Sequence, residues 1–134
     1  MNKETRLPTP DEIKALVSFL PRLYVAGFNP IIRWEGGNKD ADGIIHMPWP
    51  IYDKLVEEFI RTASRECWLD YGYRPEDAYQ MLKNDEVIKS ADLAGIKTML
   101  TFIVRGERFG DGHWGEMIER GYVRRLLERL VELV

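Results

Sequence analysis

Residues 105–113, with the sequence R-G-E-R-F-G-D-G-H, gather the side chains of this chain that are best suited to chemistry. Two arginines, two acids, one phenylalanine, three glycines and one histidine follow directly on an almost wholly apolar run. A guanidinium group donates hydrogen bonds in a fork that suits phosphate or carboxylate. Glycine lets a ligand approach the backbone closely. We therefore expect any functional site to lie in this segment, which we call the corner.

The leading interpretation of the corner is a binding site for a small anionic ligand that bears phosphate or carboxylate. A helix that begins near Asp111 would present free backbone N–H groups, and anions are stabilised at helix N-termini. The Asp111 carboxylate competes for the same N–H groups, because aspartate is itself a favourable N-cap residue. The residues expected to bind the ligand are Arg105, Arg108, Asp111, Gly112 and His113, with Glu107 orienting them.

Two other interpretations of the corner stay open. In the structural one, Arg105 and Arg108 satisfy carbonyl groups at a helix end and pair with nearby acids such as Glu116. In the catalytic one, His113 is a general acid or base, oriented by a neighbouring acid, and Arg108 stabilises developing negative charge. No nucleophile accompanies it, since Cys67 lies in R-E-C-W-L, which is typical of a packed helix end. The sequence therefore indicates no enzyme class.

The sequence predicts no cofactor and no metal site. Two histidines and one cysteine are too few and too scattered for a structural zinc site. Residues 38–45, N-K-D-A-D-G-I-I, do match the start of a calcium-binding EF-hand loop, with oxygen ligands at Asn38, Asp40 and Asp42. The twelfth position of such a loop, normally glutamate, is Trp49 here. Acidic tips that contain glycine also arise as simple turns, which we expect, with calcium binding as the alternative.

The alternative to ligand binding is a protein–protein interaction or an oligomeric scaffold. Trp49 lies in M-P-W-P, a stiff segment that could present an aromatic anchor to a partner. The apolar face of the last helix could equally cover a second subunit. Nucleic acid is not an expected partner, because the six arginines of residues 105–134 are balanced by six acids.

Composition predicts one soluble, cytoplasmic domain. The chain has 134 residues, 45% of them hydrophobic and 31% charged, which is ordinary for a single globular domain. Its formal net charge of -3 creates no field that would attract nucleic acid or an anionic membrane. The lone Cys67 cannot form an intrachain disulfide and fits a reducing compartment. We see no signal peptide and no apolar run long enough to span a membrane.

The elements of the N-terminal half begin with a capped helix. T-P-D-E at residues 9–12 combines an N-cap threonine, a proline at the first helical position and a capping-box glutamate, and Pro21 predicts a break. Residues 31–34 and 44–47 predict a small β-hairpin around a loop rich in glycine and acids. Pro50 predicts the start of a helix that continues to about residue 66, and Pro75 predicts the start of a shorter one.

The C-terminal half predicts three helices around the corner. Ser90 is expected to cap the most buried helix, residues 93–108. Asp111 is expected to cap a second helix that closes at Gly121, and the last helix repeats apolar residues at helical spacing from Val123 onward. Together the elements predict a single domain, residues 1–134, of α+β class and mainly α, with four to six helices and a hairpin insert near residues 31–47.

Several segments resemble one known family. They are A-D-L at 91–93, R-G-E-R-F at 105–109, G-H at 112–113, Gly121, the ending R-R-L-L-E-R-L, and in the N-terminal half F-L-P at 19–21, M-P at 47–48 and Tyr52. On these segments the chain resembles the small bacterial and archaeal proteins catalogued as domain of unknown function 6508. That family has no established activity, so the resemblance implies a shared fold and no mechanism. Its members often carry a cysteine next to the phenylalanine, where this chain has Gly110.

Overall fold

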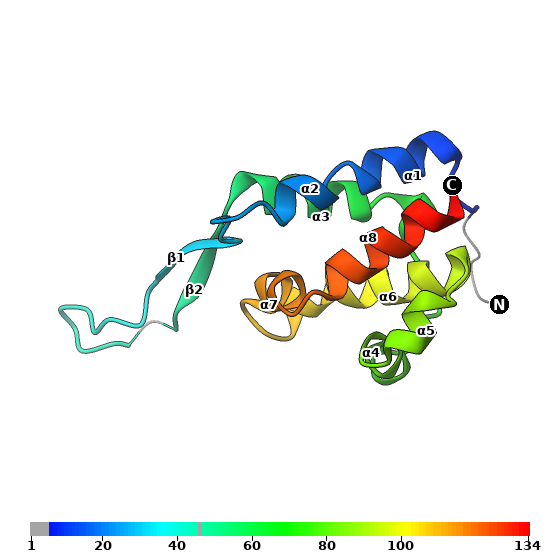
Figure 1. Cartoon of the computed structure of the whole chain (residues 1–134). Helices are drawn as coiled ribbons and strands as arrows, with labels where there is room; N and C mark the ends of the chain where they lie inside the picture. Colours follow the sequence, from blue (N-terminus) through cyan, green and yellow to red (C-terminus); the bar gives the residue numbers. More distant parts are fainter. Residues whose placement is uncertain (1–5, 46) are drawn as a thin grey trace.

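The computed structural model describes residues 6–45 and 47–134 and shows a helical body with one β-hairpin (Figure 1). Eight α-helices and one two-stranded antiparallel sheet lie within these residues, which confirms a mainly α, α+β fold. The helices outnumber the expected four to six because α2 and α5 are short segments of four and five residues. The helices are α1 (Pro10–Val17), α2 (Leu20–Leu23), α3 (Lys54–Ala63), α4 (Pro75–Leu82), α5 (Asp85–Lys89), α6 (Leu93–Arg105), α7 (His113–Glu119) and α8 (Tyr122–Leu133).

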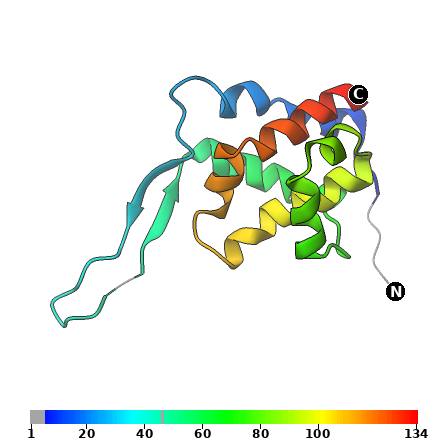
Figure 2. The ribbon, with the colours of Figure 1, turned by 60° about the horizontal axis from the view of Figure 1, so that its bottom comes forward.

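Helix α6 runs through the centre of the body. Figure 2 shows α6, in yellow, lying along α8, in orange and red, and the two helices are in contact. The buried hydroxyl of Thr101 donates to the Lys97 carbonyl at 2.8 Å and accepts from the Asp70 N–H at 2.9 Å, so it has no unmet hydrogen bond. The fully buried apolar residues of α6 are Ile96, Met99, Leu100 and Ile103. The expectation of a central, almost wholly apolar helix is confirmed.

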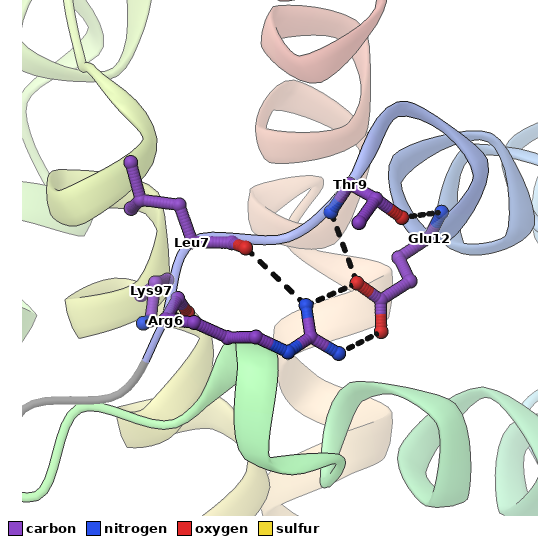
Figure 3. Close-up of polar contacts among 5 residues, drawn as sticks. All are labelled: Arg6, Leu7, Thr9, Glu12 and Lys97. Atoms are coloured by element: carbon purple, nitrogen blue, oxygen red, sulfur yellow. Dashed lines mark hydrogen bonds and ion pairs between the residues drawn. The ribbon is translucent and has the colours of Figure 1, made fainter.

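A cluster of polar contacts fixes the start of α1 (Figure 3). The Glu12 N–H donates to Thr9 Oγ1 at 3.2 Å and the Thr9 N–H donates to the Glu12 carboxylate at 2.9 Å, which is the predicted capping box. The Arg6 guanidinium donates to both oxygens of that carboxylate and holds the pKa of Glu12 well below its usual range. Lys97 of α6 donates to the Arg6 carbonyl at 3.1 Å. These bonds tie the start of α1 to the central helix.

The two strands form an arm that stands away from the helical body (Figures 1 and 2). Strand β1 (Ile31–Glu35) pairs antiparallel with β2 (Trp49–Tyr52), and an isolated bridge between Lys39 and Ile45 continues the ribbon toward its tip. Both views show it projecting from the end of the body opposite the C-terminus. We call residues 31–52 the arm.

Strand β2 begins later than the sequence pattern indicates. The strand predicted at residues 44–47 is wrong: Ile44 and Ile45 lie near the tip of the arm, and His46 lies outside the described residues. The strand formed by Trp49–Tyr52 is rich in aromatic residues, which favour extended backbone. Its Pro50 is tolerated because the strand has a free edge.

Helix α3 consequently starts after β2, and the predicted helix start at Pro50 is wrong. Asp53 sets the boundary, because its carboxylate accepts from the Leu55 N–H at 2.8 Å and so caps the helix. The helix ends at Ala63, and a 3₁₀ turn follows at Glu66–Trp68. The predicted start of α4 at Pro75 is confirmed.

Helix α6 is capped by Asp92 and not by the predicted Ser90. The Asp92 carboxylate accepts from the Gly95 N–H at 2.8 Å, whereas Ser90 follows the end of α5. The aspartate lies three residues before its partner, which is the spacing that an N-cap bond needs. A 3₁₀ turn, Gly106–Arg108, continues α6 to the predicted end at residue 108.

The apolar face of α8 packs inside the body. The helix contacts α1, α5 and α7, so its own chain covers this face, and only the last apolar positions, Val131 and Val134, are exposed. No helix in the described parts of the chain is both long enough and apolar enough to cross a membrane. The fully buried residues of α8 are Val123, Leu126, Leu127 and Leu130.

Candidate functional site

Glu107 joins the arm to the start of α7. Its carboxylate accepts hydrogen bonds from the Tyr52 hydroxyl at 2.8 Å and from the N–H groups of Gly112 and Trp114 at 2.8 and 2.9 Å. The Tyr52 hydroxyl in turn accepts from the Gly115 N–H at 3.3 Å. Burial and the hydrogen bond to Glu107 raise the pKa of Tyr52, so its hydroxyl remains a donor. Tyr52 is a partner of the corner that sequence reasoning missed.

These bonds correct the predicted cap of α7. The N-cap is Gly112, whose φ of 90° lies in the left-handed region that favours glycine, and Asp111 is exposed just outside the helix. The first N–H groups of a helix lack partners within it. Here Glu107 and Tyr52 already accept from them, so they are not free for an anion.

Two glycines let the base of the arm pack directly on α7. A Cβ built on Gly112 would lie 2.9 Å from the Trp34 ring, and one built on Gly115 would lie 2.8 Å from Ile31. Both distances are shorter than ordinary carbon contacts. The close approach fixes the direction of the arm relative to the body.

The imidazole of His113 packs over Gly106, where a Cβ would overlap its Nε2. The ring hydrogen-bonds to the backbone of Phe102, and the buried Nε2 has no partner among the described residues, so Nδ1 donates to the Phe102 carbonyl. The Phe102 ring meets the imidazole edge-on, with centroids 5.1 Å apart. Burial lowers the pKa of His113, so the ring is neutral at neutral pH and Nε2 is an acceptor.

The structure does not bring the two arginines of the corner together with His113. The Arg105 guanidinium lies over the rings of Tyr71 and Tyr73, 5.7 and 5.5 Å from their centroids. Arg108 is exposed. The local partners of Arg105 are thus aromatic rings rather than the acids of the structural interpretation. Binding of an anion at the corner stays a prediction, and this placement of the arginines lends it no support.

A pocket of about 350 Å³ opens beside His113. It gathers two of the predicted site residues, Asp111 and His113. Its charged lining residues are the acids Asp111 and Glu116, and Glu116 pairs with Arg120 at 2.9 Å. Within residues 6–45 and 47–134, no arginine or lysine lines it. The lining residues are Pro75, Phe102, Gly106, Phe109, Gly110, Asp111, His113 and Glu116.

The arm carries a second candidate surface, made of large apolar side chains. Trp49, the predicted partner anchor, is 44% exposed, and Met47 is 80% exposed. Sequence reasoning assigned no function to Ile44, Ile45 and Met47. The sequence did contain a signal for an apolar surface, because residues 43–52 contain three large aliphatic residues besides Met47 and no charged residue. The exposed apolar residues of the arm are Ile32, Trp34, Ile44, Ile45, Met47 and Trp49.

The acidic tip of the arm forms a turn. Oδ1 of Asp40 accepts from the N–H groups of Asp42 and Ile44, both at 2.9 Å. An aspartate side chain that accepts from N–H groups just ahead of it stabilises a turn, and a turn is what the sequence predicts here. In the part of the chain that the structure describes, no three or more His, Cys, Asp or Glu side chains are placed to hold a metal ion.

Comparison with known proteins identifies a family. The model of DUF6508, a family of unknown function, matches residues 8–134. The chain therefore belongs to this family. No curated protein and no solved structure matches the chain.

Proposed function

We propose that this member of the DUF6508 family is a protein-interaction module whose arm is covered by a partner, and that this partner is a second copy of the chain. The exposure of Ile44, Ile45 and Met47, at 57, 66 and 80%, on an arm that stands clear of the body carries the proposal (Figure 1). A two-stranded hairpin alone is marginally stable in water. Contiguous exposed apolar side chains mark surfaces that bind other molecules.

The corner supports this role because it holds the arm in one direction. Glu107 bonds to Tyr52 of β2, and Trp34 and Ile31 of β1 pack on the glycines of α7. A surface that is already oriented loses less conformational freedom on binding. In this account the glycines and Glu107 of the corner position the arm for its partner.

The charges of the arm favour a protein over a lipid bilayer or a nucleic acid. Lys39, Asp40 and Asp42 occupy the tip and would have to enter a membrane ahead of the apolar residues, which is costly. The arm has two basic residues, Arg33 and Lys39, against three acids, so it offers no basic surface for phosphates.

In a symmetric dimer the same surface of each copy contacts its counterpart, so that surface must be self-complementary. The arm meets this requirement. Arg33 pairs with Glu35 at 2.8 Å, and the charges of the arm nearly cancel, so two arms can approach without strong repulsion. Pro48 and Pro50 lack N–H groups and oppose the addition of a strand to the β2 edge. The apolar faces are left as the contact surface.

The proposal includes a cytoplasmic location. Cys67 is buried, and burial together with the Glu12 side chain raises its pKa to about 11. A thiol with a raised pKa reacts slowly, and an unpaired cysteine is suited to a reducing compartment.

Sedimentation velocity over a range of concentrations tests the proposal. We expect the unmodified chain to form a dimer, and a variant with Ile44→Ser, Ile45→Ser and Met47→Ser to be a monomer of unchanged helical content. Val131→Ser is the matched control, because Val131 is also an exposed apolar residue but lies on α8, and this variant should remain a dimer. A monomeric unmodified chain, or an arm variant that remains a dimer, would overturn the proposal.

A further inference from the structure

We propose that the pocket beside His113, which Phe109 also lines, binds an organic cation. The ligand would be a small molecule with a primary ammonium or guanidinium group on an apolar skeleton. This site is separate from the apolar surface of the arm. The pocket volume of about 350 Å³ is in the range of small-molecule sites. Gly110 leaves its wall open at one position, because a Cβ there would meet nothing within 4 Å.

The sign of the charge in the pocket selects a cation. Asp111 is exposed and has no hydrogen bond or ion pair within the described residues. Glu116 lines the same pocket and is partly neutralised by Arg120 at 2.9 Å. An anion would meet both carboxylates, whereas a cation would be attracted by Asp111. Arg105, which could have reversed this sign, lies over two tyrosine rings instead.

The aromatic residues of the pocket favour the same ligand class. Phe109 is 82% exposed, which is unusual for a side chain of this size, and it lines the pocket together with Phe102. The face of an aromatic ring attracts a cation through its negative quadrupole. The apolar part of the ligand would cover the exposed ring and remove it from water.

His113 lines the pocket as a neutral ring and adds no positive charge to it. Its Nδ1 donates to the Phe102 carbonyl, which leaves the buried lone pair of Nε2 without a partner in the described part of the chain. Buried polar atoms normally have a partner. Nε2 packs against Gly106 and is not exposed to the pocket, so His113 contributes a neutral wall with no donor for an anion.

Four probes that share a phenyl ring and differ in the sign of their charge test the proposal: phenethylamine and phenylguanidine against phenylacetate and phenyl phosphate. Each is titrated into the folded chain while amide chemical shifts of residues 106–116 are followed by NMR. We expect both cations, and neither anion, to shift these residues saturably, with affinity that falls as salt is added.

Two variants locate the binding group. Asp111→Asn should weaken phenethylamine binding about five-fold, because exposed ion pairs contribute up to about 1 kcal/mol. Phe109→Ala should weaken it about two- to five-fold, in line with exposed cation–π contacts. Both side chains are exposed, so we expect both variants to retain the fold. Glu119→Gln is the matched control: it removes an exposed acid of α7 outside the pocket and should leave the affinity unchanged.

Three results would overturn the proposal. In the first, neither cation causes saturable shifts. In the second, the anions bind more tightly than the cations. In the third, Asp111→Asn binds phenethylamine with unchanged affinity. Tighter binding of phenyl phosphate would instead favour an anionic ligand at the corner. Repeating the titration on the arm variant separates this result from the self-association test, because the pocket contains no residue of the arm.

Discussion

Gly106 is the residue on which the packing of His113 depends most directly. A Cβ at this position would overlap Nε2, so Gly106→Ala must displace the imidazole and break its bond to Phe102. Overpacking of this kind costs about 1–3 kcal/mol in the free energy of unfolding, which urea denaturation would measure. Gly110→Ala is the control, because a Cβ there would meet nothing within 4 Å, and its effect should stay within about 0.5 kcal/mol. Equal stability of the two variants would contradict the described packing.

The buried imidazole also predicts a pH dependence. Because burial lowers the pKa of His113 in the folded state, the folded chain prefers the neutral ring. The stability due to this group is therefore fully present above the unfolded pKa of about 6.5, and it is lost as the pH falls from there through the folded pKa. An NMR titration of the ring protons should give a pKa below the ordinary value. A pKa at or above that value would contradict the buried, neutral ring.

Hydrogen bonds between residues that are close in the sequence were predictable, whereas bonds between distant residues were not. The Thr9–Glu12 capping box was predictable because its two partners are three residues apart. The bond from Tyr52 to Glu107 joins residues 55 apart, and no pattern near either residue indicates the other. The sequence therefore identified Glu107 as a polar residue of interest but could not assign it to the arm.

At the scale of elements, Glu107 links the arm to the body. Both carboxylate oxygens accept hydrogen bonds, Oε1 from Tyr52 and Trp114 and Oε2 from Gly112. In Glu107→Gln one of these oxygens becomes an amide nitrogen, so at least one partly buried donor loses its acceptor. We expect a loss of about 1–3 kcal/mol in the free energy of unfolding and faster hydrogen exchange in β1 and β2.

Tyr52→Phe is a second test of this link. It removes the hydroxyl that donates to Glu107 and accepts from the Gly115 N–H, and it leaves the two backbone bonds to Glu107, so it should cost about 1–3 kcal/mol. Hydrogen exchange by mass spectrometry would report the arm separately from the helices. If the strands of Glu107→Gln exchanged as slowly as those of the unmodified chain, Glu107 would not be the link.

Where the start of a helix was predicted correctly, the residue that indicates it lies at that boundary. Helices α1 and α4 start where a proline occupies the first turn. The error at Pro50 has the opposite cause, because the same residue type also fits the edge of a two-stranded sheet. Only the pairing of β2 with β1, which is a contact between distant segments, decides between the two structures.

At the scale of the whole molecule, the sequence does not distinguish an apolar segment that the chain covers from one that it leaves exposed. The apolar face of the last helix and Trp49 of the arm were both candidates for contact with a partner. The structure buries Leu126 and Leu130 of α8 completely and leaves Ile45 and Met47 of the arm exposed. This difference comes from tertiary packing, which places α8 against α1, α2, α5, α6 and α7, whereas the arm stands away from the body beyond its base.

The central claim, that a second copy covers the arm, is tested most directly by isotope-filtered NOE measurements on a sample that mixes labelled and unlabelled chains. The account predicts intermolecular NOEs from the methyl groups of Ile44, Ile45 and Met47 to the unlabelled chain. A dimeric sample in which these methyl groups show only intramolecular NOEs would contradict it.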